Sequence, residues 1–143
     1  MAYTAGIFLN NKVGFKVGTT DLSNHVTAFQ LNRKVDSLEV SAMGDTAHKR
    51  VAGLSDDTIT VTFLNDRGSG SVLATLQDAF GTTVDFKAIQ VSDEAVAATN
   101  KLYTGTIFVD SLTDINGAVA DEATIDITFQ CNSKTVVASS GTW

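Results

Sequence analysis

Histidine, serine and cysteine are the side chains in this sequence that could support nucleophilic catalysis. The chain has two histidines, His25 and His48, and one cysteine, Cys131. A catalytic triad needs such a histidine beside a nucleophile and an acid, and the Gly-x-Ser-x-Gly motif that presents a nucleophilic serine is absent. Residues 68–71, Gly-Ser-Gly-Ser, differ from that motif and are interpreted as a helix entry with a capping serine. The Asp45–His48 segment is interpreted as a polar turn. We therefore predict no catalytic residue and no enzyme activity.

Metal and cofactor sites are not predicted either. The acidic pairs Asp56–Asp57 and Asp93–Glu94 lie in expected loops, but the alternating acids around a central glycine that bind Ca²⁺ are absent. A single cysteine excludes an internal disulfide and a multi-thiolate metal centre, and we expect Cys131 to be an inert thiol at the end of a strand. Phosphate-binding, dinucleotide-binding and base-stacking motifs are also missing.

Composition excludes further classes of protein. The chain has 143 residues, a formal net charge of −6, 43% hydrophobic residues and 18% charged residues. It is long enough for one domain with one core, and too apolar for a disordered chain. The ten Lys and Arg residues are scattered, which argues against a nucleic-acid clamp. No apolar run approaches the roughly 20 residues that span a bilayer, and residues 1–5 lack the pattern of a signal peptide. We expect no membrane binding.

The sequence contains no proline. Thr and Val are abundant and Asp outnumbers Glu, which is typical of strands and turns. A mostly β chain without proline keeps every backbone N–H available for pairing and lacks a common guard at its sheet edges. Either those edges are covered, or they pair with neighbours.

Alternation of apolar and polar residues predicts strands along most of the chain. The clearest is 58–64, in which Ile59, Val61 and Phe63 would face a core. Further strands are expected at residues 6–9, 13–17, 22–35, 38–42, 83–89, 102–112 and 123–131, with a turn at Asn116–Gly117. The predicted fold is mainly β, an antiparallel β-sandwich or barrel of about seven or eight strands.

One short helix is expected at about residues 69–80, flanking the sheet. Val72, Leu76 and either Ala79 or Phe80 recur at helical spacing. Gly81 follows them and suits the left-handed conformation that ends many helices.

Two polar segments are candidates for contacts between subunits. One is a long hairpin loop at about residues 43–53, with neither helical nor strand periodicity, and such loops are usually functional or flexible. The other is the tail 132–143, which follows a single domain at 1–131 and ends in the only tryptophan, Trp143. A basic arm and an aromatic anchor are typical of interfaces, although both segments could equally be dangling polar ends. The loop residues that we expect to contact another subunit are Met43, Gly44, Asp45, Thr46, His48, Lys49, Arg50 and Val51.

Several segments carry recognisable structural motifs, namely Asp21–Val26, Leu38–Thr46, Arg50–Asp56, Ile59–Phe63, the helix after 68–71, and Ala98–Gly105. Together they resemble the major tail (tail tube) proteins of long-tailed bacteriophages, especially those of actinobacterial hosts. The resemblance runs from about Asp21 to Gln130, and its motifs are structural rather than catalytic. It departs from the family pattern at Lys101–Leu102, where such sequences often have proline.

This resemblance implies a structural protein of the virion tail, assembled in the bacterial cytoplasm. Its subunits would form stacked hexameric rings around a channel for DNA ejection, with other tail proteins at the tube ends. The loop 43–53 holds the place of a family loop that reaches a neighbouring subunit or ring, and strands of adjacent subunits would join into one inner barrel. An acidic wall would let DNA pass without binding it, and Asp85 and Asp126, on the non-core faces of their strands, are candidate lumen acids.

Two alternative functions stay open on the sequence alone. One is another virion component, such as a capsid decoration protein. The other is a carbohydrate- or partner-binding module, for which Trp143 and the two tyrosines would be the candidate aromatics.

Overall fold

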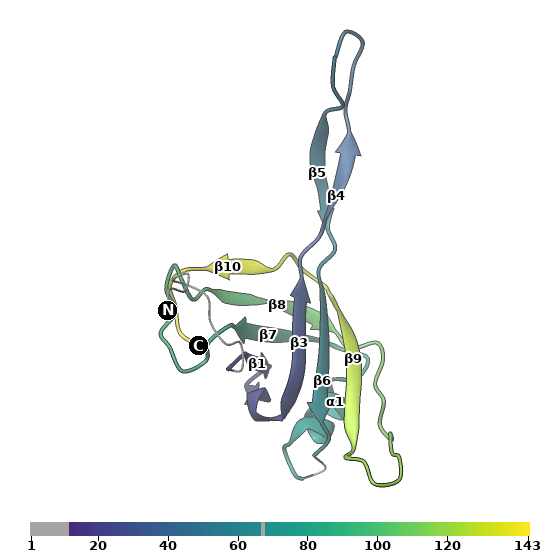
Figure 1. The fold of residues 1–143 in the computed structure, drawn as a ribbon, viewed down its shortest axis with the longest axis vertical. Coiled ribbons are helices and arrows are strands. Elements are labelled where there is room, and N and C mark those ends of the chain that lie inside the picture. The colour runs from purple at the N-terminus through teal and green to yellow at the C-terminus, as the bar shows by residue number, and fades with distance from the viewer. Residues whose placement is uncertain (1–11, 67) are drawn as a thin grey trace, which may run out of the picture.

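The computed structural model describes residues 12–66 and 68–143 (Figure 1). The strand predicted at residues 6–9 lies outside this part of the chain. The described strands are β1 (Gly14–Val17), β2 (Thr20–Asp21), β3 (Val26–Asn32), β4 (Val35–Glu39), β5 (Arg50–Ser55), β6 (Thr58–Leu64), β7 (Thr83–Ile89), β8 (Leu102–Phe108), β9 (Thr124–Cys131) and β10 (Val136–Ala138). The helices are the short 3₁₀ turn η1 (Ser23–His25) and α1 (Val72–Ala79).

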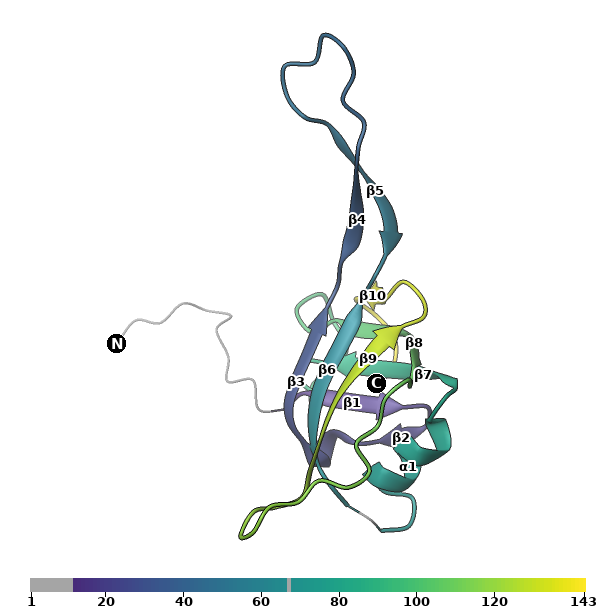
Figure 2. The ribbon, with the colours of Figure 1, turned by 90° about the vertical axis from the view of Figure 1, so that its right-hand side faces the viewer.

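Most of the strands form one antiparallel, eight-stranded sheet in the order β2-β1-β7-β8-β9-β6-β3, with β10 paired to β8. Strands β8 and β9 pair only through Ile107 with Cys131 and Phe108 with Gln130. The sheet folds over at this short ladder, and the strands of its two halves run across one another (Figures 1 and 2). The prediction of a mainly β, antiparallel fold with one short helix is confirmed.

The core lies between the two halves of the folded sheet. Ile59, Val61 and Phe63 of β6 are buried, as the alternation of that strand predicts. The Phe15 ring, from the opposite half, lies 5.2 Å from the Phe29 ring, centroid to centroid. Its centroid is also 6.2 Å from those of Phe63 and Phe129. This aromatic cluster joins the two layers.

Helix α1 lies inside the predicted range and contributes to the same core. Val72, Leu76 and Ala79 are buried, whereas Phe80 is 54% exposed. The inward position at the end of the helix is therefore Ala79. Gly81 has a φ of +76°, the left-handed conformation expected there.

The structure corrects several predicted boundaries. The expected strand 22–35 is interrupted by η1 and ends at Asn32, and the expected strand 102–112 ends at Phe108. The turn expected at Asn116–Gly117 instead involves residues 118–121, where the Asp121 N–H donates to the Ala118 carbonyl at 3.3 Å. The expected strand 38–42 is β4, which ends at Glu39, and the hairpin loop expected at 43–53 lies at 40–49, because pairing of Glu39 with Arg50 places residues 50–53 in β5. Among the described residues, no helix is long and apolar enough to cross a membrane.

Candidate functional site

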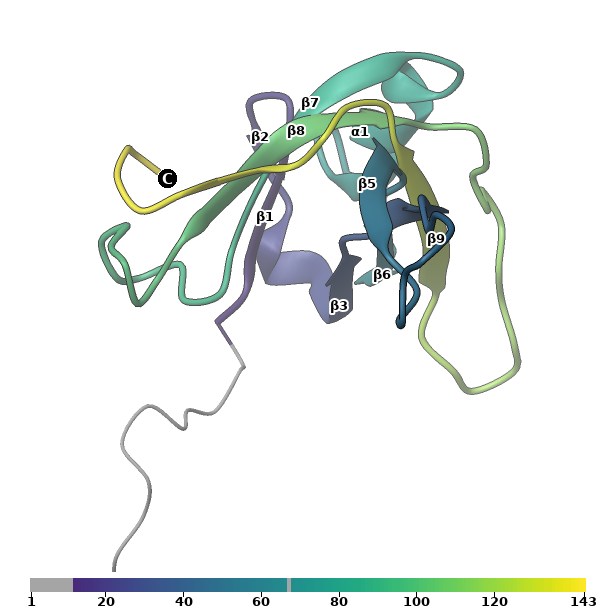
Figure 3. The same ribbon diagram turned by 90° about the horizontal axis from the view of Figure 1, so that it is seen from above.

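A hairpin projects from the sandwich. Strands β4 and β5 form a separate two-stranded sheet. This sheet extends away from the core in the direction of β3 and β6 (Figures 1 and 2). We call residues 33–57 the arm. Seen from above, it rises over the layer formed by β3, β6 and β9 (Figure 3). The arm contains all of the loop residues that the sequence analysis singled out.

The arm exposes apolar side chains along its length. Leu38 and Val51 are opposite each other in the β4–β5 ladder, so they share one face. They are 53% and 49% exposed, and Leu54 and Met43 are 80% and 104% exposed. Concentrated exposure of large apolar groups marks a surface for association. Sequence alternation could not identify this surface, because it does not reveal whether a second layer covers a strand.

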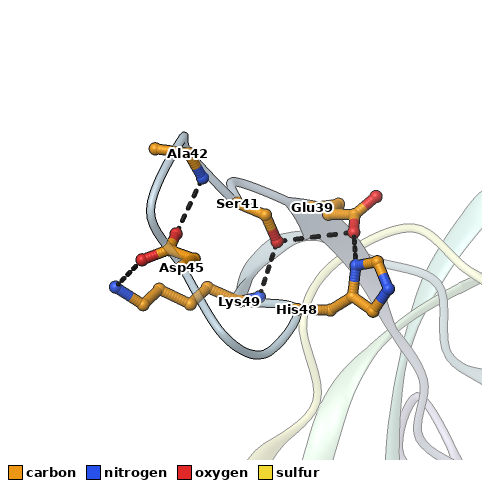
Figure 4. Close-up of polar contacts among 6 residues, drawn as sticks. All are labelled: Glu39, Ser41, Ala42, Asp45, His48 and Lys49. Atoms are coloured by element: carbon orange, nitrogen blue, oxygen red, sulfur yellow. Dashed lines mark hydrogen bonds and ion pairs between the residues drawn. The ribbon is translucent and has the colours of Figure 1, made fainter.

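Polar contacts fix the conformation of the arm tip (Figure 4). The Lys49 N–H donates to the Ser41 hydroxyl at 2.9 Å, and the Ala42 N–H donates to the Asp45 carboxylate at 2.7 Å. The Lys49 ammonium lies 2.8 Å from Asp45. The hydrogen bond from Ala42, followed by that from Lys49, holds the pKa of Asp45 below its ordinary value. The tip is thus held by its own polar groups.

Basic side chains at the tip lie close to carboxylates of the arm. Lys49 pairs with Asp45, and His48 contacts the Glu39 carboxylate (Figure 4). Arg50 lies opposite Glu39 in the β-ladder. Half of the twelve large apolar side chains that are exposed among the described residues belong to the arm, so exposed apolar surface is concentrated there.

The layer formed by β3, β6 and β9 has an unusual outer face. Its three strands contain no Lys or Arg and a single acid, Asp126. Asp126 accepts a hydrogen bond from the Thr62 hydroxyl at 2.7 Å. We call this surface the threonine face, whose outward residues are Ala28, Gln30, Asn32, Thr58, Thr60, Thr62, Asp126, Thr128 and Gln130.

Strand β3 ends this layer. It pairs with β6 on one side, and it is the last strand in the order of the sheet. A cavity of about 490 Å³ lies beside it, between the two layers, and its lining includes Phe29, Leu31 and Tyr103. Among the described residues, no strand pairs with the outer edge of β3, and a sheet edge next to a partly apolar cavity is a natural place for further strand pairing.

The two candidate lumen acids lie on different surfaces. Asp126 is on the threonine face, whereas Asp85 is on β7 in the other half of the sheet. Both are exposed. In the β7 layer, Lys87 lies opposite Lys16 in the ladder with β1, so Asp85 has lysine neighbours. The strands of the layer that contains Asp126, β3, β6 and β9, have no lysine. The structure therefore does not bring the two acids together.

The C-terminal tail contacts the sandwich of its own chain. β10 extends the main sheet beside β8, and the Lys16 ammonium lies 4.5 Å from the centre of the Trp143 ring. A Cβ added to Gly14 would lie 2.4 Å from a carbon of that ring, so the indole fits against a position that only glycine leaves free. Contact of Trp143 with another subunit stays a prediction.

The potentially reactive side chains are dispersed. His25 pairs with Asp66 at 3.0 Å, while His48 contacts Glu39 at the far end of the arm. Burial, followed by the nearby charge of Asp57, raises the pKa of the Cys131 thiol to about 11. Across residues 12–66 and 68–143, no group of three or more His, Cys, Asp or Glu residues could hold a metal ion.

Comparisons with known proteins give matches in structure. No protein-family model and no curated protein matches the sequence. A chain in the virion of a native gene transfer agent particle matches with a TM-score of 0.73 and 11% identity, covering 92% of this chain and 99% of that chain. A chain of the SPP1 tail tube matches with a TM-score of 0.72 and 14% identity, covering 92% and 78%.

A third match comes from the tail of an empty gene transfer agent particle, which has C6 symmetry. Its TM-score is 0.61 at 12% identity, covering 80% of this chain and 82% of that chain. Identities this low establish a shared fold and nothing finer. The chain therefore has a fold that is also found in the SPP1 tail tube and in the tail of the gene transfer agent.

Proposed function

We propose that this protein is a structural, non-catalytic subunit of a phage-like tail tube, in which its copies form stacked rings around a channel for DNA ejection. The observation that carries the proposal is the projecting arm with its uncovered apolar side chains, on a fold that the SPP1 tail tube shares. A subunit that acted alone would gain nothing from exposing Leu38, Met43 and Leu54. The same residues are explained if the arm packs on another copy.

Six subunits per ring is the number that the comparison favours, because the similar tail of the gene transfer agent has C6 symmetry. The outer edge of β3, which no described strand covers, would pair with a strand of an adjacent subunit and so close the ring. This role also explains the absence of proline, since proline would remove N–H groups from such ladders. The arm would then contact a neighbouring subunit or the next ring.

The threonine face is the surface that best suits the wall of a DNA channel. Cationic side chains bind phosphates and release counterions, and the strands of this face carry no Lys or Arg. Hydroxyl and amide groups offer only weak, neutral contacts, and Asp126 adds repulsion. We therefore propose Asp126, rather than Asp85, as a lumen acid. DNA would pass without specific binding.

The remaining partners would be other tail proteins at the two ends of the tube, and the location would be the virion tail. Electron microscopy of the purified, concentrated protein tests the proposal directly. Wild-type protein should form rings or tubes, alone or when seeded with a tail-tip initiator. A compact monomer under all of these conditions would contradict the proposed function, and trimers that bind empty capsids would point to a decoration protein.

A further inference from the structure

Asp57 is a buried carboxylate at the base of the arm. It lies between β5 and β6 and is 3% exposed. None of the ion pairs among the described residues includes it. A buried charge without a cationic partner must be held by hydrogen bonds.

Both carboxylate oxygens of Asp57 accept hydrogen bonds from the backbone, and the donors belong to different segments. Oδ1 accepts from the Lys34 N–H at 3.0 Å, and Oδ2 accepts from the Thr135 N–H at 3.0 Å. Lys34 lies where β3 passes into β4, and Thr135 lies just before β10. One side chain therefore joins both strands of the arm base to the C-terminal segment.

Backbone contacts around Asp57 complete this junction. The main-chain carbonyl of Asp57 accepts from the Cys131 N–H at 3.0 Å, and the Asp56 N–H donates to the Lys34 carbonyl at 2.8 Å. Burial by itself would raise the pKa of Asp57, but the hydrogen bonds from Thr135 and Lys34 and the charge of Arg33 outweigh it and lower that pKa. The ionised form, which can accept at both oxygens, is the one that the fold selects.

Strand pairing is weakened at the arm base, where the hydrogen bond from the Asp56 N–H to the Lys34 carbonyl links the two ladders. Pairing of β3 with β6 ends at Asn32 and Thr58, and pairing of β4 with β5 resumes at Val35 and Ser55. A cavity of about 350 Å³ lies beside this break, lined by residues of the arm base and by Lys134 and Thr135. The break is thus a place where the arm has room to change direction.

We propose that Asp57 is the positioning residue that sets the direction of the arm relative to the sandwich, by fastening the arm base to the segment before β10. Its importance for assembly rests on the proposed function, since an arm must point at its neighbour to pack on it. The effect of Asp57 on arm direction in a single chain does not depend on the proposed function.

The test compares Asp57→Asn with Asp56→Asn. Both substitutions remove one negative charge from adjacent positions, but Asp56 is exposed and Asp57 is buried. In Asp57→Asn, one oxygen becomes an NH₂ donor that faces a backbone N–H. Spin labels are placed on exposed positions at the arm tip and on α1, through Ala47→Cys and Gln77→Cys in a Cys131→Ser background. An excess of unlabelled protein restricts the signal to pairs within one chain.

Double electron–electron resonance then gives the distribution of distances between tip and helix. We expect a narrow distribution for wild type and for Asp56→Asn, and a broadened or shifted one for Asp57→Asn at a temperature where circular dichroism shows it folded. An unchanged distribution in Asp57→Asn, even with a lower melting temperature, would overturn the proposal, because it would reduce Asp57 to a stabilising residue.

If Asp57→Asn does not fold, hydrogen exchange in the wild-type chain tests whether Asp57 fastens the arm base. The amides of Lys34 and Thr135 should then be protected as strongly as those of the β6 ladder. Exchange as fast as at the exposed arm tip would overturn the proposal.

Electron microscopy adds the assembly readout, with Asp57→Asn expected to give fewer and shorter tubes than Asp56→Asn. Equal tube yields would refute the link between arm direction and assembly. If wild-type protein forms no tubes, the proposed function fails, while the spin-label comparison still decides the role of Asp57.

Discussion

The arm and the sandwich are both antiparallel β-structure, yet they are stabilised in different ways. Along β6 every second residue is buried, and Ile59, Val61 and Phe63 are at most 1% exposed. Along β4 every residue is exposed. Burial of apolar surface holds the sandwich together, whereas the arm relies on its own ladder and on the polar contacts of its tip. Because a two-stranded ribbon is marginal by itself, the arm would gain stability by packing on a neighbouring subunit in the proposed tube.

The largest effect should come from placing a charge in the sandwich. Phe63→Asp would bury an unpaired carboxylate among Phe15, Ile125 and their neighbours, at a cost of several kcal/mol, and the subunit should not fold. The matched control is Thr60→Asp on the same strand, whose side chain points outward. Circular dichroism and urea titration measure both. A folded Phe63→Asp subunit would contradict the assignment of the core.

Polar substitutions in the arm should have the opposite outcome, because they should leave the subunit folded but prevent its assembly. Leu38→Ser with Val51→Ser removes two exposed apolar groups, so the stability of the isolated subunit should change by no more than about 0.5 kcal/mol. Assembly should nevertheless be lost, as measured by sedimentation and electron microscopy. Phe80→Ser is a control that removes an exposed aromatic outside the arm. Tubes formed at wild-type yield by the double variant would show that these arm side chains do not contact a neighbour.

Acid should weaken the junction between the two regions. The pKa of Asp57 is lowered in the folded chain, so its stabilising effect is present above the unfolded value, about 3.9, and is lost as the pH falls through the folded value. Asp57→Asn should cost about 1.5–3 kcal/mol at neutral pH, the range for hydrogen bonds to charged groups. The cost should shrink as the pH falls below about 3.9, as followed by urea titration. A cost that stayed constant with pH would show that ionisation of Asp57 is not involved.

The sequence predicts the sandwich far better than the arm, for a physical reason. Burial on one face leaves an alternating pattern, and for this reason β6, β7 and β9 and the helix are recovered with nearly correct bounds. In the arm burial imposes no such pattern, so the strand predicted at 38–42 overshoots the end of β4 at Glu39, and residues 50–53 are predicted as loop although Arg50 pairs with Glu39. The junction at Asp57 is missed as well. Its partners Lys34 and Thr135 are distant in sequence, and a pair of adjacent aspartates resembles an ordinary solvated turn.

A smaller effect is expected on the threonine face. Thr60→Lys with Thr128→Lys would place two cations opposite each other across β6 and β9 without touching the core. If this face lines the channel, tubes should still form, and DNA ejection should slow because phosphates now meet cations. The control is Asp85→Lys, which puts a cation on the other layer. Equal ejection rates in wild type, in the double threonine variant and in Asp85→Lys would refute the assignment of the channel wall.

The smallest effect is expected in the C-terminal tail. If Trp143 packs on Gly14, this contact adds to the free energy of unfolding of the sandwich. Gly14→Ala would push a methyl group against the indole and, to a lesser degree, against Ile89. Because Trp143 lies near the surface, we expect a loss of about 1 kcal/mol. A double-mutant cycle with Trp143→Ala, measured by urea titration, separates the two contacts. In the absence of the indole, only the part of the cost due to Ile89 should remain. An equal cost in both backgrounds would mean that the indole does not rest on Gly14 in solution, and Trp143 would then be free, like the arm, to contact another subunit.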